Sequence, residues 1–123
     1  MRVLIAEDEP KVREFLQLHF QAAGHEVEGT PSAQGIREHL RRQAPDVLLL
    51  DMWLQDSKDG FAVLEEARRL APRTAIIIVT GIEEDTTRER ALKLGALALL
   101  NKPIRLEELD ALVASLSPPS RVS

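Results

Sequence analysis

The chain alternates short apolar runs with longer stretches in which apolar residues recur every three or four positions. A short apolar run bounded by turn residues is typical of a buried β-strand, and the three-and-four recurrence is typical of an amphipathic helix. We therefore predict five strands, each followed by a helix. The predicted strands are residues 2–6, 26–29, 46–51, 75–80 and 96–100.

Residues that favour helix ends support the same division of the chain. Pro10 suits the first turn of the first helix, and Gly24 suits the end of that helix. Ser32 is a good N-cap for the second helix, because its hydroxyl can accept a hydrogen bond from a free backbone amide. Pro72 ends the third helix, and Gly95 closes a charged fourth helix.

The strands predicted at 46–51 and 75–80 are apolar without alternation, as expected of strands covered by helices on both sides. Alternation of such strands with helices predicts a parallel sheet. Right-handed crossovers leave few topologies. We expect a doubly wound, flavodoxin-like α/β fold with five strands in the order 2-1-3-4-5 and helices on both faces. Residues 1–116 would form this domain, and residues 117–123 a proline- and serine-rich tail or the start of a linker.

Composition narrows the classes of function. The 123 residues include no cysteine, which excludes disulfides, zinc–thiolate sites and thiol catalysis. Sixteen Lys and Arg against 20 Asp and Glu give a net charge of −4, and aromatic residues make up 3%, so we expect no direct nucleic-acid binding. No apolar run approaches the roughly 20 residues of a membrane span, and we expect a cytoplasmic protein without membrane association.

Polar residues follow four of the predicted strands. Glu7 and Asp8 come after the first, Asp51 ends the third, Thr80 ends the fourth and Lys102 follows the fifth. The carboxyl ends of parallel strands meet at one edge of the sheet, where ligands bind at the switch point between the first and third strands. Three carboxylates there would repel one another without a cation among them, and oxygen ligands favour Mg²⁺ over zinc. A carboxylate beside a metal, a lysine and a hydroxyl is suited to phosphoryl transfer.

This spaced set, together with Lys102-Pro103, resembles the receiver domain of two-component response regulators over essentially the whole chain. The resemblance implies that Asp51 accepts a phosphoryl group from the phosphohistidine of a histidine kinase or a phosphotransfer protein. It also implies that Asp8, Asp51 and the backbone carbonyl of Trp53 hold Mg²⁺, with Glu7 assisting through water.

The resemblance further implies a switch. Thr80 would bond a phosphoryl oxygen, Lys102 would pair with the phosphoryl group, and Lys102-Pro103 would be a cis peptide. The face formed by the fourth helix, the fifth strand and the fifth helix would then change. A downstream protein target, an output domain or a second copy of the chain would dock on that face.

Two features depart from the family pattern. Leu99 lies three residues before Lys102, where many receivers carry a Tyr or Phe that turns inward together with the threonine. No aromatic ring is therefore available here for that coupling. Gln55 stands where proline is common, and Gly60 comes one residue later than usual, so we expect an atypical loop after Asp51.

A third feature concerns the lifetime of the acyl phosphate. Positions two residues after the phosphoacceptor and two after the threonine tune that lifetime in the family, and here they are Trp53 and Ile82. Both side chains are bulky and apolar, so they would screen the aspartyl phosphate from water. We expect slow autodephosphorylation.

Three functions remain in view at this stage. The leading one is a phosphorylation-dependent switch that changes partner binding, rather than a turnover enzyme. The alternative is a receiver-like interaction module that acts without phosphorylation, which Leu99 and the altered loop favour. A Mg²⁺-dependent phosphohydrolase with Asp51 as nucleophile is disfavoured, because the residue two positions on is Trp53 and not an acid. The tail suits both a stand-alone receiver and one cut from a larger regulator.

Overall fold

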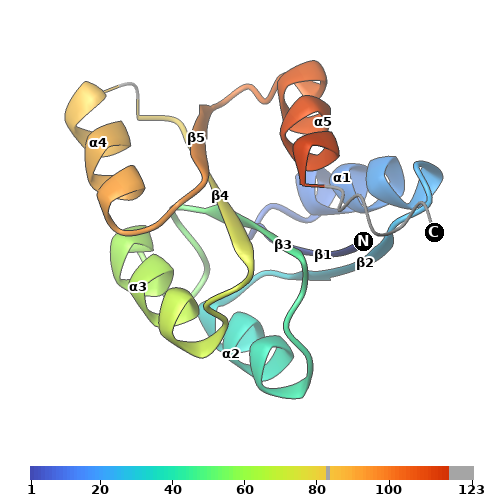
Figure 1. The fold of residues 1–123 in the computed structure, drawn as a ribbon, viewed down its shortest axis with the longest axis horizontal. Helices are drawn as coiled ribbons and strands as arrows, with labels where there is room; N and C mark the ends of the chain where they lie inside the picture. Colours follow the sequence, from blue (N-terminus) through green and yellow to red (C-terminus); the bar gives the residue numbers. More distant parts are fainter. Residues whose placement is uncertain (83, 117–123) are drawn as a thin grey trace.

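The predicted alternation of strands and helices is confirmed in the computed structural model, which describes residues 1–82 and 84–116 (Figure 1). The elements are β1 (Arg2–Ala6), α1 (Pro10–Ala22), β2 (Glu26–Thr30), α2 (Ala33–Arg42), β3 (Val47–Asp51), α3 (Gly60–Leu70), β4 (Ala75–Thr80), α4 (Asp85–Lys93), β5 (Ala98–Asn101) and α5 (Leu106–Ser115). In this part of the chain no helix combines the length and apolarity needed to cross a bilayer. The predicted tail at 117–123 lies outside the described residues.

The strands form one parallel sheet in the order β2-β1-β3-β4-β5, as predicted. Helices α1 and α5 pack on one face of the sheet, and α2, α3 and α4 pack on the other (Figure 1). β2 lies on one side of β1, and β3, β4 and β5 follow on the other side, so the strand order changes direction between β1 and β3. In such a fold the crevice beyond the carboxyl ends of these two strands is the usual place for a ligand.

Apolar layers on both faces hold the sheet rigidly. Every residue of β3 is buried, and so is every residue of β4 after Ala75. Leu16 and Phe20 of α1 pack against one face, and Leu64 of α3 packs against the other. Burial of a large apolar side chain contributes about 1.5–3 kcal/mol. The central strands therefore fix the positions of the polar residues that follow them.

The helix ends lie where proline, serine and glycine predict them. Pro10 is the first residue of α1, and the Ser32 side chain accepts a hydrogen bond of 3.0 Å from the Gly35 amide. Gly24 and Gly95, which follow α1 and α4, have φ angles of 93° and 103°. These left-handed values favour glycine, because a Cβ would meet the following carbonyl group.

Four strand ends differ from the prediction by one or two residues, including β5, which ends at Asn101 and not at residue 100. β2 includes Thr30, and β3 begins at Val47. β5 begins at Ala98, two residues later than predicted, because the Ala96 amide still bonds the Ala91 carbonyl at the end of α4. These differences leave every predicted element in place.

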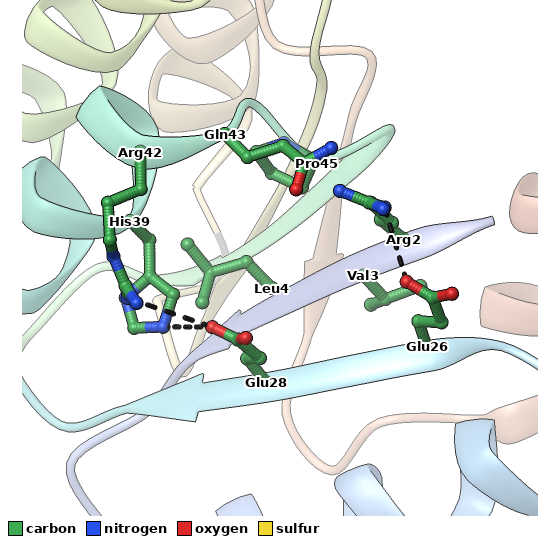
Figure 2. Close-up of a pocket in the computed structure, with 9 residues that line it drawn as sticks. All are labelled: Arg2, Val3, Leu4, Glu26, Glu28, His39, Arg42, Gln43 and Pro45. Atoms are coloured by element: carbon green, nitrogen blue, oxygen red, sulfur yellow. Dashed lines mark ion pairs between the residues drawn. The ribbon is translucent and has the colours of Figure 1, made fainter.

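The amino-terminal edge of the sheet carries a hollow of about 200 Å³ beside the end of α2 (Figure 2). Glu28 of β2 lies against the His39 ring, and its Oε2 is 3.9 Å from Arg42 Nη2. Arg2 Nε pairs with Glu26 Oε2 at 3.2 Å between β1 and β2. The last turn of α2 is thereby tied to β2 at the edge opposite the predicted site.

Candidate functional site

The acidic residues predicted to meet at the carboxyl edge do lie together. Glu7 and Asp8 follow β1, and Asp51 is the last residue of β3, the neighbouring strand. One carboxylate oxygen from each lies within 4.8 Å of the others. Glu7 and Asp51 are buried, and Asp8 is partly exposed. The cluster therefore has one side open to solvent and one side against the core.

Lys102 closes the cluster from β5. Its Nζ is 3.0 Å from Asp51 Oδ2 and 3.3 Å from Glu7 Oε1. The Lys102 amide donates to the Thr80 carbonyl at 2.8 Å, which holds the lysine backbone beside the end of β4. The Lys102-Pro103 peptide is cis, as the resemblance implies.

Burial and neighbouring charged groups shift the pKa values of Glu7 and Lys102. Burial, helped by the hydrogen bond with Asp51 and by its negative charge, raises the pKa of Glu7 to about 7. The Glu9 amide, which donates to Glu7 Oε2 at 3.1 Å, and the Lys102 charge lower it only partly. Burial by itself would lower the pKa of Lys102, but its contacts with Asp51 and Glu7 raise it. Lys102 is therefore a fixed cation, whereas Glu7 binds a proton near neutral pH.

These residues fit a small divalent cation. Their side chains offer only carboxylate oxygens, which suit Mg²⁺ and not a soft metal. Three carboxyl groups gather there beside the single ammonium group of Lys102, so a cation would meet an excess of acidic ligands. The Trp53 amide donates to Asp51 Oδ1 at 3.1 Å, so the main chain of Trp53 is held close to the same carboxylate.

The two residues predicted to take part in the switch, Thr80 and Leu99, are both buried. The Thr80 side chain is buried, and its Oγ1 accepts a hydrogen bond of 3.1 Å from the Ile82 amide in the next loop. Leu99 is 2% exposed and packs inward with the apolar residues beneath α3 and α4. The hydroxyl is thus engaged with its own loop, and the leucine occupies the inner side of β5.

The loop after Asp51 contains a tight turn. Leu54 and Ser57 form an isolated antiparallel bridge, with the Leu54 amide donating to the Ser57 carbonyl at 2.8 Å. Gly60 then packs on Met52, where a Cβ would lie 2.7 Å from the Met52 Cα. Glycine is therefore required at position 60. The Trp53 side chain is 54% exposed beside this turn.

A set of contacts made by Asn101 and Arg88 near the site was not predicted from the sequence. Asn101 Nδ2 donates to the Ile82 carbonyl at 2.8 Å, which joins β5 to the loop after Thr80. Arg88 of α4 donates to the Leu99 carbonyl at 2.8 Å and to Asn101 Oδ1 at 3.3 Å. An asparagine and an arginine 13 positions apart carry no recognisable spacing, so only the folded chain reveals this contact.

Sequence comparison gives relatives over nearly the whole chain. Residues 3–114 match the family model of the response regulator receiver domain. The TorCAD operon transcriptional regulatory protein TorR of Escherichia coli K12 is 36% identical over 114 residues, which are 93% of this chain and 49% of TorR. The transcriptional regulatory protein PhoP of the same strain is 30% identical over 116 residues, 94% of this chain and 52% of PhoP. The chain thus spans about half the length of these curated relatives.

Solved structures agree with the sequence comparison. A CheY-like response regulator receiver domain protein from Methanospirillum hungatei is 27% identical, with a TM-score of 0.85 over 94% of this chain and 92% of that one. A crystal structure described as a response regulator of Chloroflexus aurantiacus is 26% identical, with a TM-score of 0.83 over 94% and 95% of the two chains. Fold, acidic cluster and sequence lead to one conclusion: the chain belongs to the response regulator receiver domain family of two-component systems.

Proposed function

We propose that Asp51 of this chain accepts a phosphoryl group from the phosphohistidine of a histidine kinase or a phosphotransfer protein. Phosphorylation-dependent switching is the function of the receiver family. The observation that carries the proposal is the placement of Lys102 Nζ 3.0 Å from Asp51 Oδ2, inside the acidic cluster. In the transfer an Asp51 carboxylate oxygen forms a bond to phosphorus as the phosphorus–nitrogen bond of the phosphohistidine breaks.

Each side chain has a distinct part in this proposal. Receiver domains bind Mg²⁺ at an acidic pocket, and here Asp8, Asp51 and the Trp53 carbonyl would hold it, with Glu7 acting through water. Bound Mg²⁺ would withdraw charge from the phosphoryl oxygens. Lys102 supplies a positive charge beside the reacting carboxylate of Asp51, which is itself buried.

The switch follows from a change of partner at Thr80. Its hydroxyl accepts a hydrogen bond from the Ile82 amide and would turn to a phosphoryl oxygen once Asp51 is modified. The loop between β4 and α4 would then shift, and with it the face formed by α4, β5 and α5. We propose that this face binds a downstream protein, an output domain or a second copy of the chain in the cytoplasm, and that nucleic acid is not bound directly.

Mass spectrometry of the intact protein tests the proposal. The protein is incubated with Mg²⁺ and acetyl phosphate, a small acyl-phosphate donor, beside the Asp51→Asn variant and an EDTA control. One added phosphoryl group is expected in the unchanged protein and none in the variant or with EDTA. Absence of any adduct, in a folded protein whose Trp53 fluorescence still responds to Mg²⁺, would overturn it.

An interaction module that acts without phosphorylation is the second candidate. It is favoured by Leu99, which already packs inward and offers no aromatic ring to move with Thr80. Such a module would bind the same partner equally with and without acetyl phosphate. Receiver domains are not conventional enzymes, and we propose that this one catalyses only its own phosphorylation and dephosphorylation. A phosphohydrolase would need an acid for the leaving group, and the residue two positions after Asp51 is Trp53.

A further inference from the structure

The loop that follows Asp51 is hydrogen-bonded to the first turn of α2. Asp56 Oδ1 accepts a hydrogen bond of 2.7 Å from the Ala33 amide, and its Oδ2 accepts one of 3.0 Å from the Gln34 amide. Ala33 and Gln34 are the first two residues of α2, whose amides have no partner within the helix. Asp56 therefore caps α2 from a segment more than 20 residues away in sequence.

Neighbouring contacts make the same segment stiff. The Gln55 amide donates to the Pro31 carbonyl at 3.2 Å, and the bridge between Leu54 and Ser57 places Asp56 in a tight turn. Leu54 is 1% exposed, so the turn is also anchored in the core. Trp53 immediately precedes this turn, with its amide bound to Asp51 Oδ1. Between Asp51 and Asp56 the main chain is thus held at several successive residues.

The charge of Asp56 suits this role. Desolvation alone would raise the pKa of Asp56, but hydrogen bonds from the amides of Ala33, Gln34 and Asp56 itself lower it, with help from Arg37. The side chain is therefore a carboxylate at neutral pH. A carboxylate at a helix N-terminus forms charge-assisted hydrogen bonds and interacts favourably with the helix dipole.

The helix that receives Asp56 is itself held in place. At its other end His39 and Arg42 contact Glu28 of β2, as Figure 2 shows. Its inner face buries Ala33, Ile36 and Leu40 in the core. With both ends and one face anchored, α2 is a fixed support against which the loop is positioned.

We propose that Asp56 is a positioning residue for the Asp51 site: by clamping the loop to the first turn of α2, it places the Trp53 carbonyl and so sets the affinity for Mg²⁺. This inference rests on the proposed role of Trp53 as a ligand. Coupling between two sites is reciprocal, so Mg²⁺ binding also stabilises the hydrogen bonds at Ala33 and Gln34.

Mg²⁺ titrations followed by Trp53 fluorescence test the clamp without any phosphorylation. Trp53 is the only tryptophan in the chain, and the main-chain carbonyl in question is its own. Asp56→Ala is expected to weaken Mg²⁺ binding about fivefold or more, a coupling of ~1 kcal/mol. Asp56→Asn, which keeps an oxygen acceptor for one amide, is expected to recover part of the affinity.

Asp59→Ala is the matched control. Asp59 lies in the same loop and caps α3 by accepting a hydrogen bond of 3.2 Å from the Ala62 amide, but it does not contact α2 through any described hydrogen bond. Both alanine variants lose a helix cap, so both should lower the melting temperature. Only Asp56→Ala should change the affinity for Mg²⁺. Equal loss of affinity in the two variants, or none in Asp56→Ala, would overturn the proposal.

Amide hydrogen exchange separates this proposal from the proposed function. Mg²⁺ should slow exchange at Ala33 and Gln34 in the unchanged protein and should do so much less in Asp56→Asn. If Mg²⁺ binds but acetyl phosphate adds nothing to Asp51, the proposed function fails while the clamp is still measured by these rates. If Mg²⁺ does not bind at all, exchange over residues 52–57 that is no faster in Asp56→Ala than in Asp59→Ala would overturn the clamp.

Discussion

At the scale of single residues, the site is set by groups whose charges oppose one another. Glu7 is 3% exposed and lies beside Asp51, and its pKa is raised to about 7. Lys102 compensates only part of this charge. Gathering these oxygen ligands lowers the stability of the folded protein, and strongly shifted pKa values of this kind are common at functional sites.

Glu7 predicts a pH dependence of stability in the metal-free protein. A carboxyl group with a pKa of about 4.5 when unfolded and about 7 when folded binds its proton more tightly in the folded state. The resulting stabilisation is present below pH 4.5 and is lost as the pH rises through 7, by ~3 kcal/mol at most. Urea unfolding in EDTA should therefore show Glu7→Gln gaining on the unchanged protein from pH 5 to pH 8. A stability difference independent of pH would contradict this assignment.

Trp53 and Ile82 predict a long-lived acyl phosphate. Both residues flank the carboxyl edge of the sheet, and each follows a site residue by two positions. We expect Trp53→Ala and Ile82→Ala each to speed loss of the phosphoryl group by up to about tenfold, because water gains access to the phosphorus atom. The phosphorylated fraction is followed by intact mass after the donor is removed. A wild-type half-life that neither substitution shortens would exclude screening by these side chains.

At the scale of elements, a contact between β5 and the loop after β4 is a further point of control. The Asn101 side-chain oxygen accepts a hydrogen bond from Arg88, and the Asn101 side-chain amide donates one to the Ile82 carbonyl. Asn101→Asp keeps the acceptor for Arg88 but removes the donor to Ile82, whereas Asn101→Ala removes both. We expect both variants to lose about 1 kcal/mol of stability and to speed amide exchange at Ile82. If only Asn101→Ala changes the loop, then Arg88 and not the Ile82 contact holds it.

The elements themselves are largely predictable from the chain. The β-branched run at 75–80 gives β4 to the residue, and Pro10 marks the start of α1, because these preferences depend only on local sterics and hydrogen bonding. The meeting of Glu7, Asp51 and Lys102 follows from strand order once the sheet is parallel.

Other contacts depend on the packed structure and were not predictable. Phe15 shares the helical spacing of the buried Leu16 and Phe20, yet it is 55% exposed and does not belong to the core cluster on that face of the sheet. Asp56 and Asn101 are ordinary polar residues in the sequence, and their roles arise from partners 19 to 23 positions away. Hydrophobic pattern determines the elements, whereas long-range polar contacts are decided by the final geometry.

At the scale of the whole molecule, the elements differ in how firmly they are anchored. β3 and β4 are almost wholly buried, and α2 is held at both ends. In α4, by contrast, Ala91 is the buried residue among the nine, and Leu92 is 46% exposed. Elements with few buried contacts open most readily, so a change at the Thr80 loop should move α4 before any other helix.

Hydrogen exchange before and after phosphorylation measures this difference. In the unmodified protein we expect exchange to be faster across α4 than across α2, because a single alanine anchors α4 in the core. Phosphorylation of Asp51 should change exchange in α4 and β5, where Arg88 joins the two elements, and leave β2, the strand at the opposite edge of the sheet, unchanged. Asp51→Asn treated with the same donor is the control. A change in exchange spread evenly over the helices α1 to α5 would instead mean that phosphorylation stabilises the whole domain. It would contradict the proposal that the face formed by α4, β5 and α5 is the output surface.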